Sequence, residues 1–268
     1  MPLPESCPTA TNPSGTRGPI VSVRGLAIGY GSQPILEDLW FDVERGEILV
    51  ILGESGCGKS TLMKGMTGLQ RPLSGDVLID GESIVMADPA TKARLQRGLG
   101  ITYQSGALFG SLSVLENVRF PLDEFTRIGL RQRNLIARML LHLVELGHAE
   151  TMMPAELSGG MIKRAGIARA MALGADILML DEPSAGLDPI TAANLDRTIL
   201  DLRRRLGFTF VVVTHELQSI FTIADRAIML DAESRGIIAM GSPADLRDRS
   251  QDPRVRQFFN HRPDTPPA

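Results

Sequence analysis

The chain reads Gly53-Glu54-Ser55-Gly56-Cys57-Gly58-Lys59-Ser60-Thr61 directly after an apolar run, Ile48 to Leu52. This stretch fits the G-x-x-x-x-G-K-[ST] pattern of a phosphate-binding loop between a buried strand and a helix. Glycines let the backbone curl so that its N–H groups point at phosphate oxygens, and the helix start adds a positive dipole end. Lys59 would supply a charge to the terminal phosphates, and the Ser60 hydroxyl would hold Mg²⁺. The stretch therefore predicts a nucleotide site.

Composition restricts the class of protein. The chain has 268 residues, a formal net charge of −3 and a pI of about 5.9, so no overall basic field favours nucleic acid or anionic lipid. Its two cysteines, Cys7 and Cys57, lie in a proline-rich segment and in the phosphate loop, which does not suggest a disulfide. No apolar run reaches the roughly 18–20 residues that span a bilayer. Residues 1–19 lack the apolar stretch of a secretory signal, so we expect a soluble protein with a disordered tail over 1–19.

Strand-like and helical patterns alternate along the chain, as in mainly parallel α/β proteins. Between about residues 113 and 172 strand formers are few, and Ser113 with Glu116 fits a capping box that opens a helix. Continuous apolar runs return at 177–180 and 208–213, as expected for strands covered on both faces. The sequence thus predicts a helical block inserted into a nucleotide-binding sheet domain.

A carboxylate pair, Asp181 and Glu182, follows the apolar run 177–180 at the carboxyl end of a predicted strand. There Asp181 would bind Mg²⁺ opposite the phosphate loop, and Glu182 would polarise an attacking water. Such a pair can also simply cap the next turn. The phosphate loop upstream favours the catalytic interpretation.

A second candidate phosphate site is the sequence Leu157-Ser158-Gly159-Gly160-Met161, which opens a predicted helix. A hydroxyl and free N–H groups at a helix N-terminus attract anions, although Ser158 would also make an ordinary N-cap. One loop already surrounds the phosphates of one nucleotide. A second anion site is therefore best used on a nucleotide held by another copy of the chain, which predicts a head-to-tail dimer with two composite sites.

The order of these motifs resembles that of the ATP-binding subunits of ABC transporters, over about residues 21–241. The matching positions are Tyr30 for the aromatic that stacks on adenine, Gly53 to Thr61 for the Walker A loop, Gln104 for the Q-loop, Leu157 to Met161 for the signature motif, Asp181 and Glu182 for Walker B and the catalytic glutamate, Ser184 to Asp188 for the D-loop, and His215 for the switch histidine. Taken alone, Tyr30 would be a solvent-facing turn residue and His215 a capping histidine. Their places in the series favour the functional interpretation.

The resemblance implies an α/β fold of the P-loop NTPase class, with a RecA-like sheet core, an N-terminal antiparallel β subdomain and an inserted helical subdomain. It implies ATP and Mg²⁺ as ligands, with Ser60, Gln104 and Asp181 at the metal. Glu182 would position water, Gln104 would also sense a membrane partner, and His215 would hold the γ-phosphate. The implied nucleotide contacts are Tyr30, Gly53, Glu54, Ser55, Gly56, Cys57, Gly58, Lys59, Ser60, Thr61, Ser158, Gly159, Gly160 and Asp188.

We predict two segments beyond the tail. Residues 20–241 would form the ATP-binding domain, with its helical subdomain at about 105–172, and residues 242–268 a C-terminal extension. In that extension, Phe258 and Phe259 would pack either across the dimer or on their own domain.

One departure from the usual family pattern is Met161, where the signature normally has Gln, so the hydrogen bonds of that amide are absent. Together with residues 104–122, this variant is similar to the ATPases of Mce/Mla-type lipid transporters. Leu108 and Phe109 would form an apolar notch for a permease helix, or else belong to the subdomain core.

The resemblance implies an ATPase whose two copies close on MgATP and drive a permease that moves phospholipid or a related lipid across the cell envelope. The implied partners are a second copy, integral membrane permease subunits, a STAS-like accessory protein and an MCE-type lipid-binding protein, with no nucleic acid. The chain would lie at the cytoplasmic face of the inner membrane. An ABC ATPase for a non-lipid cargo stays open and, more remotely, a soluble ABC-type ATPase of DNA repair or translation.

Overall fold

The structure, a computed structural model, describes residues 18–260 and is built on a six-stranded sheet. Its strands run in the order β10 (Gly236–Gly241), β9 (Arg226–Asp231), β3 (Ile48–Gly53), β8 (Thr209–Val213), β7 (Ile177–Asp181) and β6 (Leu99–Thr102). All neighbours are parallel except β10 and β9. The carboxyl ends of β3, β6, β7 and β8 therefore meet at one edge, where ligands bind in open α/β sheets.

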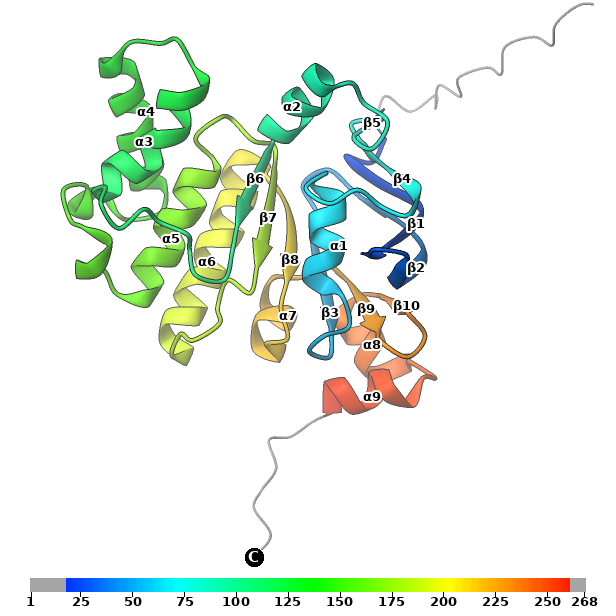
Figure 1. The fold of residues 1–268 in the computed structure, drawn as a ribbon. Helices are drawn as coiled ribbons and strands as arrows, with labels where there is room; N and C mark the ends of the chain where they lie inside the picture. The colour runs from blue at the N-terminus through cyan, green and yellow to red at the C-terminus, as the bar shows by residue number, and fades with distance from the viewer. Residues whose placement is uncertain (1–17, 261–268) are drawn as a thin grey trace, which may run out of the picture.

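A second, antiparallel sheet has the order β2 (Gln33–Val43), β1 (Val21–Tyr30), β4 (Ser74–Ile79) and β5 (Glu82–Ser83). The predicted N-terminal antiparallel β subdomain is thus confirmed. Helix α1 (Lys59–Met66) lies between this sheet and the central one, and α2 (Pro89–Arg97) leads into β6 (Figure 1).

Strand β3 separates two hydrophobic cores. Ile48, Val50 and Leu52 pack in the core that contains the helices after β6, whereas Leu49 and Ile51 pack in the core that contains α1 and the antiparallel sheet. Alternate side chains of a strand point to opposite faces, so an apolar residue is needed at every position. The continuous apolar run seen in the sequence is explained by these two cores.

Helices α6 (Pro189–Leu206) and α7 (Leu217–Ile223) follow β7 and β8, and α5 (Gly159–Ala170) precedes β7. Together they cover the face of the central sheet opposite α1 (Figure 1). Asp188 is the N-cap of α6 and accepts hydrogen bonds from the N–H groups of Ile190 and Thr191, with Pro189 at the first helical position.

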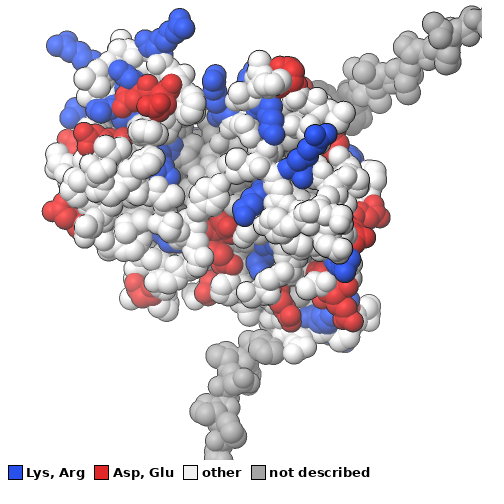
Figure 2. All heavy atoms as spheres, viewed as in Figure 1, with Lys and Arg blue, Asp and Glu red and all other residues white. Residues whose placement is uncertain are grey.

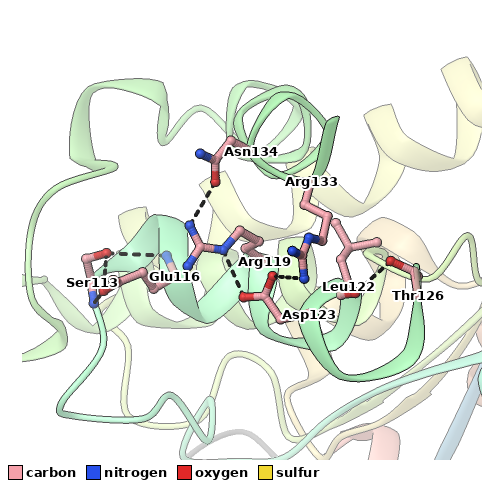
Figure 3. Close-up of polar contacts among 8 residues, drawn as sticks. All are labelled: Ser113, Glu116, Arg119, Leu122, Asp123, Thr126, Arg133 and Asn134. Atoms are coloured by element: carbon pink, nitrogen blue, oxygen red, sulfur yellow. Dashed lines mark hydrogen bonds and ion pairs between the residues drawn. The ribbon is translucent and has the colours of Figure 1, made fainter. Parts of the chain in front are cut away.

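The chain between β6 and β7 also holds α3 (Val114–Phe125), α4 (Leu130–Leu143) and two short 3₁₀ turns, Gly147–Ala149 and Pro154–Glu156. The predicted capping box is present, because Ser113 and Glu116 each accept a hydrogen bond from the other's N–H. Figure 3 shows Asp123 between Arg119 of its own helix and Arg133 of α4. Its carboxylate oxygens lie 2.8 Å from Nε of Arg119 and 2.7 Å from Nη1 of Arg133. This paired carboxylate joins the two helices of the inserted block. The limits 105–172 of a helical subdomain stay a prediction.

The C-terminal residues described form α8 (Pro243–Arg249) and α9 (Pro253–Asn260). Val255 and Phe259 are buried against the same chain, and the Phe259 ring lies edge-on to Phe221 with centroids 5.7 Å apart. Of the two alternatives for the phenylalanines, the structure places Phe259 on its own domain. Residues 261–268 and residues 1–17, which include Cys7 and most of the predicted tail, lie outside the described residues.

Charged side chains of both signs are mixed on the face of the molecule drawn in Figure 2. On this face Lys and Arg are interspersed with Asp and Glu, with broad uncharged areas between them. Within residues 18–260, every helix is too short or too polar to cross a bilayer.

Candidate nucleotide and catalytic site

The phosphate loop connects β3 to α1 and is shaped by glycines with positive φ. Gly53 has φ 146° and Gly58 has φ 103°. A Cβ on Gly53 would meet the carbonyl oxygen of Leu230 at 2.4 Å, and one on Gly58 would meet the side chain of Ile35 at 2.8 Å. Both positions therefore need glycine for conformation and for space.

The side chains of the loop point in different directions. Lys59 Nζ donates to the carbonyl oxygens of Gly53 and Glu54 at 2.8 and 2.9 Å, and so lies over the mouth of the loop. Cys57 is buried in the core instead, and burial raises the pKa of its thiol. Cys57 can therefore contact a nucleotide only through its backbone.

A pocket of about 610 Å³ opens above the loop. It is lined by Ile35, Gly53, Glu54, Ser55, Gly56, Gly58, Lys59, Ser60, Thr61, Gln104, Glu182, His215 and Phe258. The structure thus brings together the loop, the Q-loop glutamine, the predicted catalytic glutamate and the switch histidine. Asp181 lies beside the pocket, because Ser60 Oγ donates to its carboxylate at 3.4 Å.

Glu182 has the geometry of a preorganised carboxylate. It has φ 48°, in the left-handed region that costs a residue with a side chain on the order of 1–3 kcal/mol. Its Oε1 lies 2.9 Å from Nδ1 of His215. Its Oε2 is buried and, among the described residues, has no hydrogen-bond partner. The Glu182 side chain is only 14% exposed, whereas His215 is 57% exposed.

A buried lysine holds the main chain that carries this carboxylate. Lys163 of α5 is 8% exposed, and its Nζ donates to the main-chain carbonyls of Gln104 at 2.5 Å and Glu182 at 3.1 Å. Burial lowers the pKa of Lys163, while the carboxylates of Glu182 and Asp181 act in the opposite direction.

The signature residues lie outside this pocket, at the start of α5. Ser158 is the N-cap of α5, and its Oγ accepts a hydrogen bond from the Met161 N–H at 3.3 Å. A Cβ on Gly160 would come within 2.3 Å of Thr191 Cγ2. Of the residues described, six predicted nucleotide contacts do not line the pocket: Tyr30, Cys57, Ser158, Gly159, Gly160 and Asp188.

Three pocket or support residues were not expected from the sequence: Ile35, Phe258 and Lys163. Ile35 lies near the start of β2, Phe258 on α9, and Lys163 one turn into the signature helix. An apolar residue in a strand carries no signal of a pocket. Lys163 shares the segment 161–172 with Arg164 and Arg169, so nothing in the sequence singled it out for a buried role.

Residues 36–185 match the protein family described as ABC transporter. The intermembrane phospholipid transport system ATP-binding protein MlaF of Escherichia coli K12 is 39% identical over 247 residues, which cover 92% of this chain and 91% of MlaF. The probable ribonucleotide transport ATP-binding protein mkl of Mycobacterium leprae is 40% identical over 245 residues, which cover 91% of this chain and 70% of mkl.

Solved structures show the same fold. A dimeric ATP-binding cassette in a post-hydrolysis state, bound to ADP and phosphate, superposes with a TM-score of 0.74 at 28% identity, covering 83% of this chain and 98% of that one. CbiO1 of Clostridium perfringens, part of an ABC transporter complex, superposes with a TM-score of 0.79 at 27% identity, covering 85% and 90%. The predicted Walker A loop, Gln104 and Glu182 surround one pocket, and the chain belongs to the ABC transporter family as an ATP-binding subunit that hydrolyses ATP.

Proposed function

We propose that Glu182 is the catalytic carboxylate for ATP hydrolysis and that His215 assists it at the γ-phosphate. The single observation that carries this assignment is the Glu182 carboxylate in the pocket wall, with Oε1 2.9 Å from Nδ1 of His215 and Oε2 without a hydrogen-bond partner among the described residues. A carboxylate oxygen with a free lone pair in a partly desolvated pocket can accept a proton from water as it attacks phosphorus. The bond from Oε1 to His215 fixes which oxygen is free.

Lys59 and the loop N–H groups would hold the phosphates in this proposal. The Lys59 ammonium, now on the carbonyls of Gly53 and Glu54, is placed to exchange one of them for a phosphate oxygen. Tyr30, 58% exposed at the end of β1, would stack on the base from outside the pocket.

Mg²⁺ fits the same site. The Ser60 hydroxyl faces an Asp181 carboxylate oxygen at 3.4 Å, and oxygen donors of this kind are what Mg²⁺ prefers. Within residues 18–260, no group of three His, Cys, Asp or Glu side chains could hold a metal by itself. The metal would therefore depend on phosphate oxygens, with Ser60, Asp181 and Gln104 around it, and it would neutralise charge on the phosphates.

We further propose that two copies complete each site. Ser158, Gly159 and Gly160 do not line the pocket of their own chain, whereas Ser158 and Gly159 are exposed at the start of α5. The dimeric cassette bound to ADP and phosphate supports a nucleotide-linked dimer. In this arrangement Ser158 and the Asp188 loop of one copy would face the phosphates bound by the other.

The cargo we propose is a phospholipid or related lipid, moved by a permease in the inner membrane with this chain on its cytoplasmic face. Support comes from MlaF, which matches nearly end to end. Phe109, 45% exposed beside Phe120 and Arg169, leaves an aromatic surface for a permease helix, while Leu108 packs against the core. A STAS-like accessory protein and an MCE-type lipid-binding protein belong to the same proposal.

The experiment compares ATP hydrolysis and oligomeric state for wild type, Glu182→Gln and Glu216→Gln. Glu216 is the matched control, because it lies beside His215 but is exposed. We expect Glu182→Gln to lose hydrolysis by about 100-fold or more and to accumulate as an ATP-bound dimer. Glu216→Gln should hydrolyse ATP like wild type. Normal hydrolysis by Glu182→Gln would refute the assignment.

A ribonucleotide is a second candidate for the cargo, because the mkl relative at 40% identity is named a probable ribonucleotide transport ATP-binding protein. The two are separated by reconstituting the chain with its permease in liposomes. Stimulation of ATP hydrolysis and movement by phospholipid supports the first proposal, and the same responses to ribonucleotides support the second.

A further inference from the structure

Lys163 occupies an unusual position for a lysine. It lies in helix α5, five residues after the N-cap Ser158, and it is one of few charged residues that the fold buries. A buried ammonium is costly unless hydrogen bonds replace its water shell. Here two main-chain carbonyls replace it, those of Gln104 and Glu182. These residues are the Q-loop glutamine and the proposed catalytic carboxylate.

The backbone at Glu182 needs to be held. Its left-handed φ of 48° is unfavourable for a residue with a side chain and persists only where surrounding contacts fix it. Its N–H donates to the Val213 carbonyl at 2.8 Å. Its carbonyl accepts from the Ala185 N–H at 3.2 Å and from Lys163 at 3.1 Å. The other two bonds go to residues at or just after the ends of β8 and β7, whereas Lys163 reaches Glu182 from helix α5.

The Q-loop is held by the same helix. Arg169, further along α5, donates to the Ala107 carbonyl at 2.6 Å. Gly106 lies so close to α5 that a Cβ on it would meet the Ile162 side chain at 2.6 Å. Lys163 thus connects a loop already fastened to α5 with the turn that carries Glu182.

We propose that Lys163 is a positioning residue for ATP hydrolysis, which fixes the Glu182 turn and the Q-loop relative to the signature helix. It touches main-chain oxygens and acts through Glu182. A shift of α5 is thereby transmitted to the catalytic carboxylate. The inference rests on the proposed role of Glu182.

The test compares Lys163→Met, Lys163→Arg and Arg164→Met in the full chain. Methionine keeps much of the length and removes the donors, whereas arginine keeps donors for both carbonyls. Arg164 is the matched control, since it lies on the same helix and donates to a main-chain carbonyl, that of Val144, away from the pocket. The readouts are kcat for ATP hydrolysis, the Kd for a fluorescent ATP analogue, and Tm.

We expect Lys163→Met to lower kcat at least about tenfold while the Kd changes less than about threefold. Lys163→Arg should recover at least about half of the wild-type kcat, and Arg164→Met should keep kcat within about twofold. Equal losses of kcat and Tm in Lys163→Met and Arg164→Met, or no rescue by arginine, would overturn the proposal.

Two further variants keep the result interpretable. If Lys163→Met does not fold, Lys163→Gln takes its place, because its side chain is one bond shorter and its amide is uncharged, so it cannot replace the ammonium on both carbonyls. Its kcat should fall by at least about fivefold, and an unchanged kcat overturns the proposal. Glu182→Gln is assayed in parallel. If it hydrolyses ATP normally, the catalytic assignment fails; if it is inactive while Lys163→Met is normal, only the positioning role fails.

Discussion

Two helices of this molecule begin with glycine-rich motifs, and their glycines serve opposite purposes. At the start of α1, Gly53 and Gly58 have positive φ, which bends the loop into a cradle. At the start of α5, Gly159 and Gly160 belong to the helix itself. A larger side chain has little room there, because Leu187 lies against Gly159 and Thr191 against Gly160. The same residue type therefore provides conformational freedom in one place and close packing in the other.

The two helix starts also differ in what they have left to offer. Gly58 is the N-cap of α1 and has no side chain to cap with, so the first N–H groups of α1 face the pocket. Ser158 already caps α5, and that helix start lies away from its own pocket. The first is a binding site within one chain. In the proposed dimer, the second would become one only against another chain, so one motif would need a dimer and the other would not.

The largest effect is expected at Gly58. Gly58→Ala would place a Cβ 2.8 Å from Ile35 at φ 103°, and strain of about 1–3 kcal/mol there would weaken ATP binding by about 5- to 150-fold. Gly174→Ala is the control, because Gly174 has a φ of 75° but open space around it, far from the pocket. Titration with a fluorescent ATP analogue measures both. ATP affinity lost equally in the two variants would mean that the loop is not specifically strained.

A smaller and different effect is expected at Gly160. Gly160→Ala would push the methyl group of Thr191 and shift α5 against the D-loop helix, leaving the ATP Kd within about threefold but lowering hydrolysis and ATP-dependent dimerisation about tenfold. Thr191→Ser removes the clashing methyl and keeps the hydroxyl that donates to Asp188 at 2.5 Å. The double variant should therefore recover activity. A Gly160→Ala protein that binds ATP tenfold more weakly would contradict the separation of the two helix starts.

Sequence patterns predicted several local elements of the fold. The apolar run of β3 and the Ser113 capping box are local signals, because the responsible residues lie within a few positions of one another. The bridge made by Lys163 was not predictable in this way. It joins residues 59 and 19 positions apart, and only the folded arrangement of β6, β7 and α5 brings them together.

Two pocket features show the same limit. An apolar segment at 255–259 predicted that the C-terminus docks, but nothing local indicated that Phe258 would reach the phosphate loop pocket. Cys57 fits the loop motif as a nucleotide contact, yet its side chain is buried in the core beneath. A motif fixes the backbone path of a loop, and the direction of each side chain depends on what packs around it.

The smallest expected effect concerns Asp196 and its neighbours Leu187 and Ser219, a group of residues called the platform below. A change of charge at Asp196 leaves the residues of both helix starts unaltered. Asp196 of α6 is 4% exposed, beside a cavity of about 90 Å³ that Leu187 and Ser219 also line. Burial raises the pKa of Asp196, with a hydrogen bond from Ser219 acting in the opposite direction. Because the folded-state pKa is raised, the carboxyl stabilises the fold below its unfolded pKa, and that stability is lost as pH rises through the folded pKa.

Asp196→Asn should therefore raise Tm at pH 7.5 by about 2–4 °C, since the amide keeps a partner for Ser219 and carries no charge to desolvate. The gain should shrink as pH falls through the raised folded-state pKa, because the buried carboxyl is then protonated and carries no charge to desolvate. Asp201→Asn, on the same helix but partly exposed, should change Tm by less than about 1 °C. Thermal unfolding across this pH range measures the difference between variant and wild type, which cancels the titration of groups common to both.

ATP affinity should be unchanged in Asp196→Asn, because no residue of the platform lines the nucleotide pocket of its own chain. A gain in Tm that is the same at pH 4 and pH 7.5 would show that packing, and not the buried charge, limits the stability of this platform.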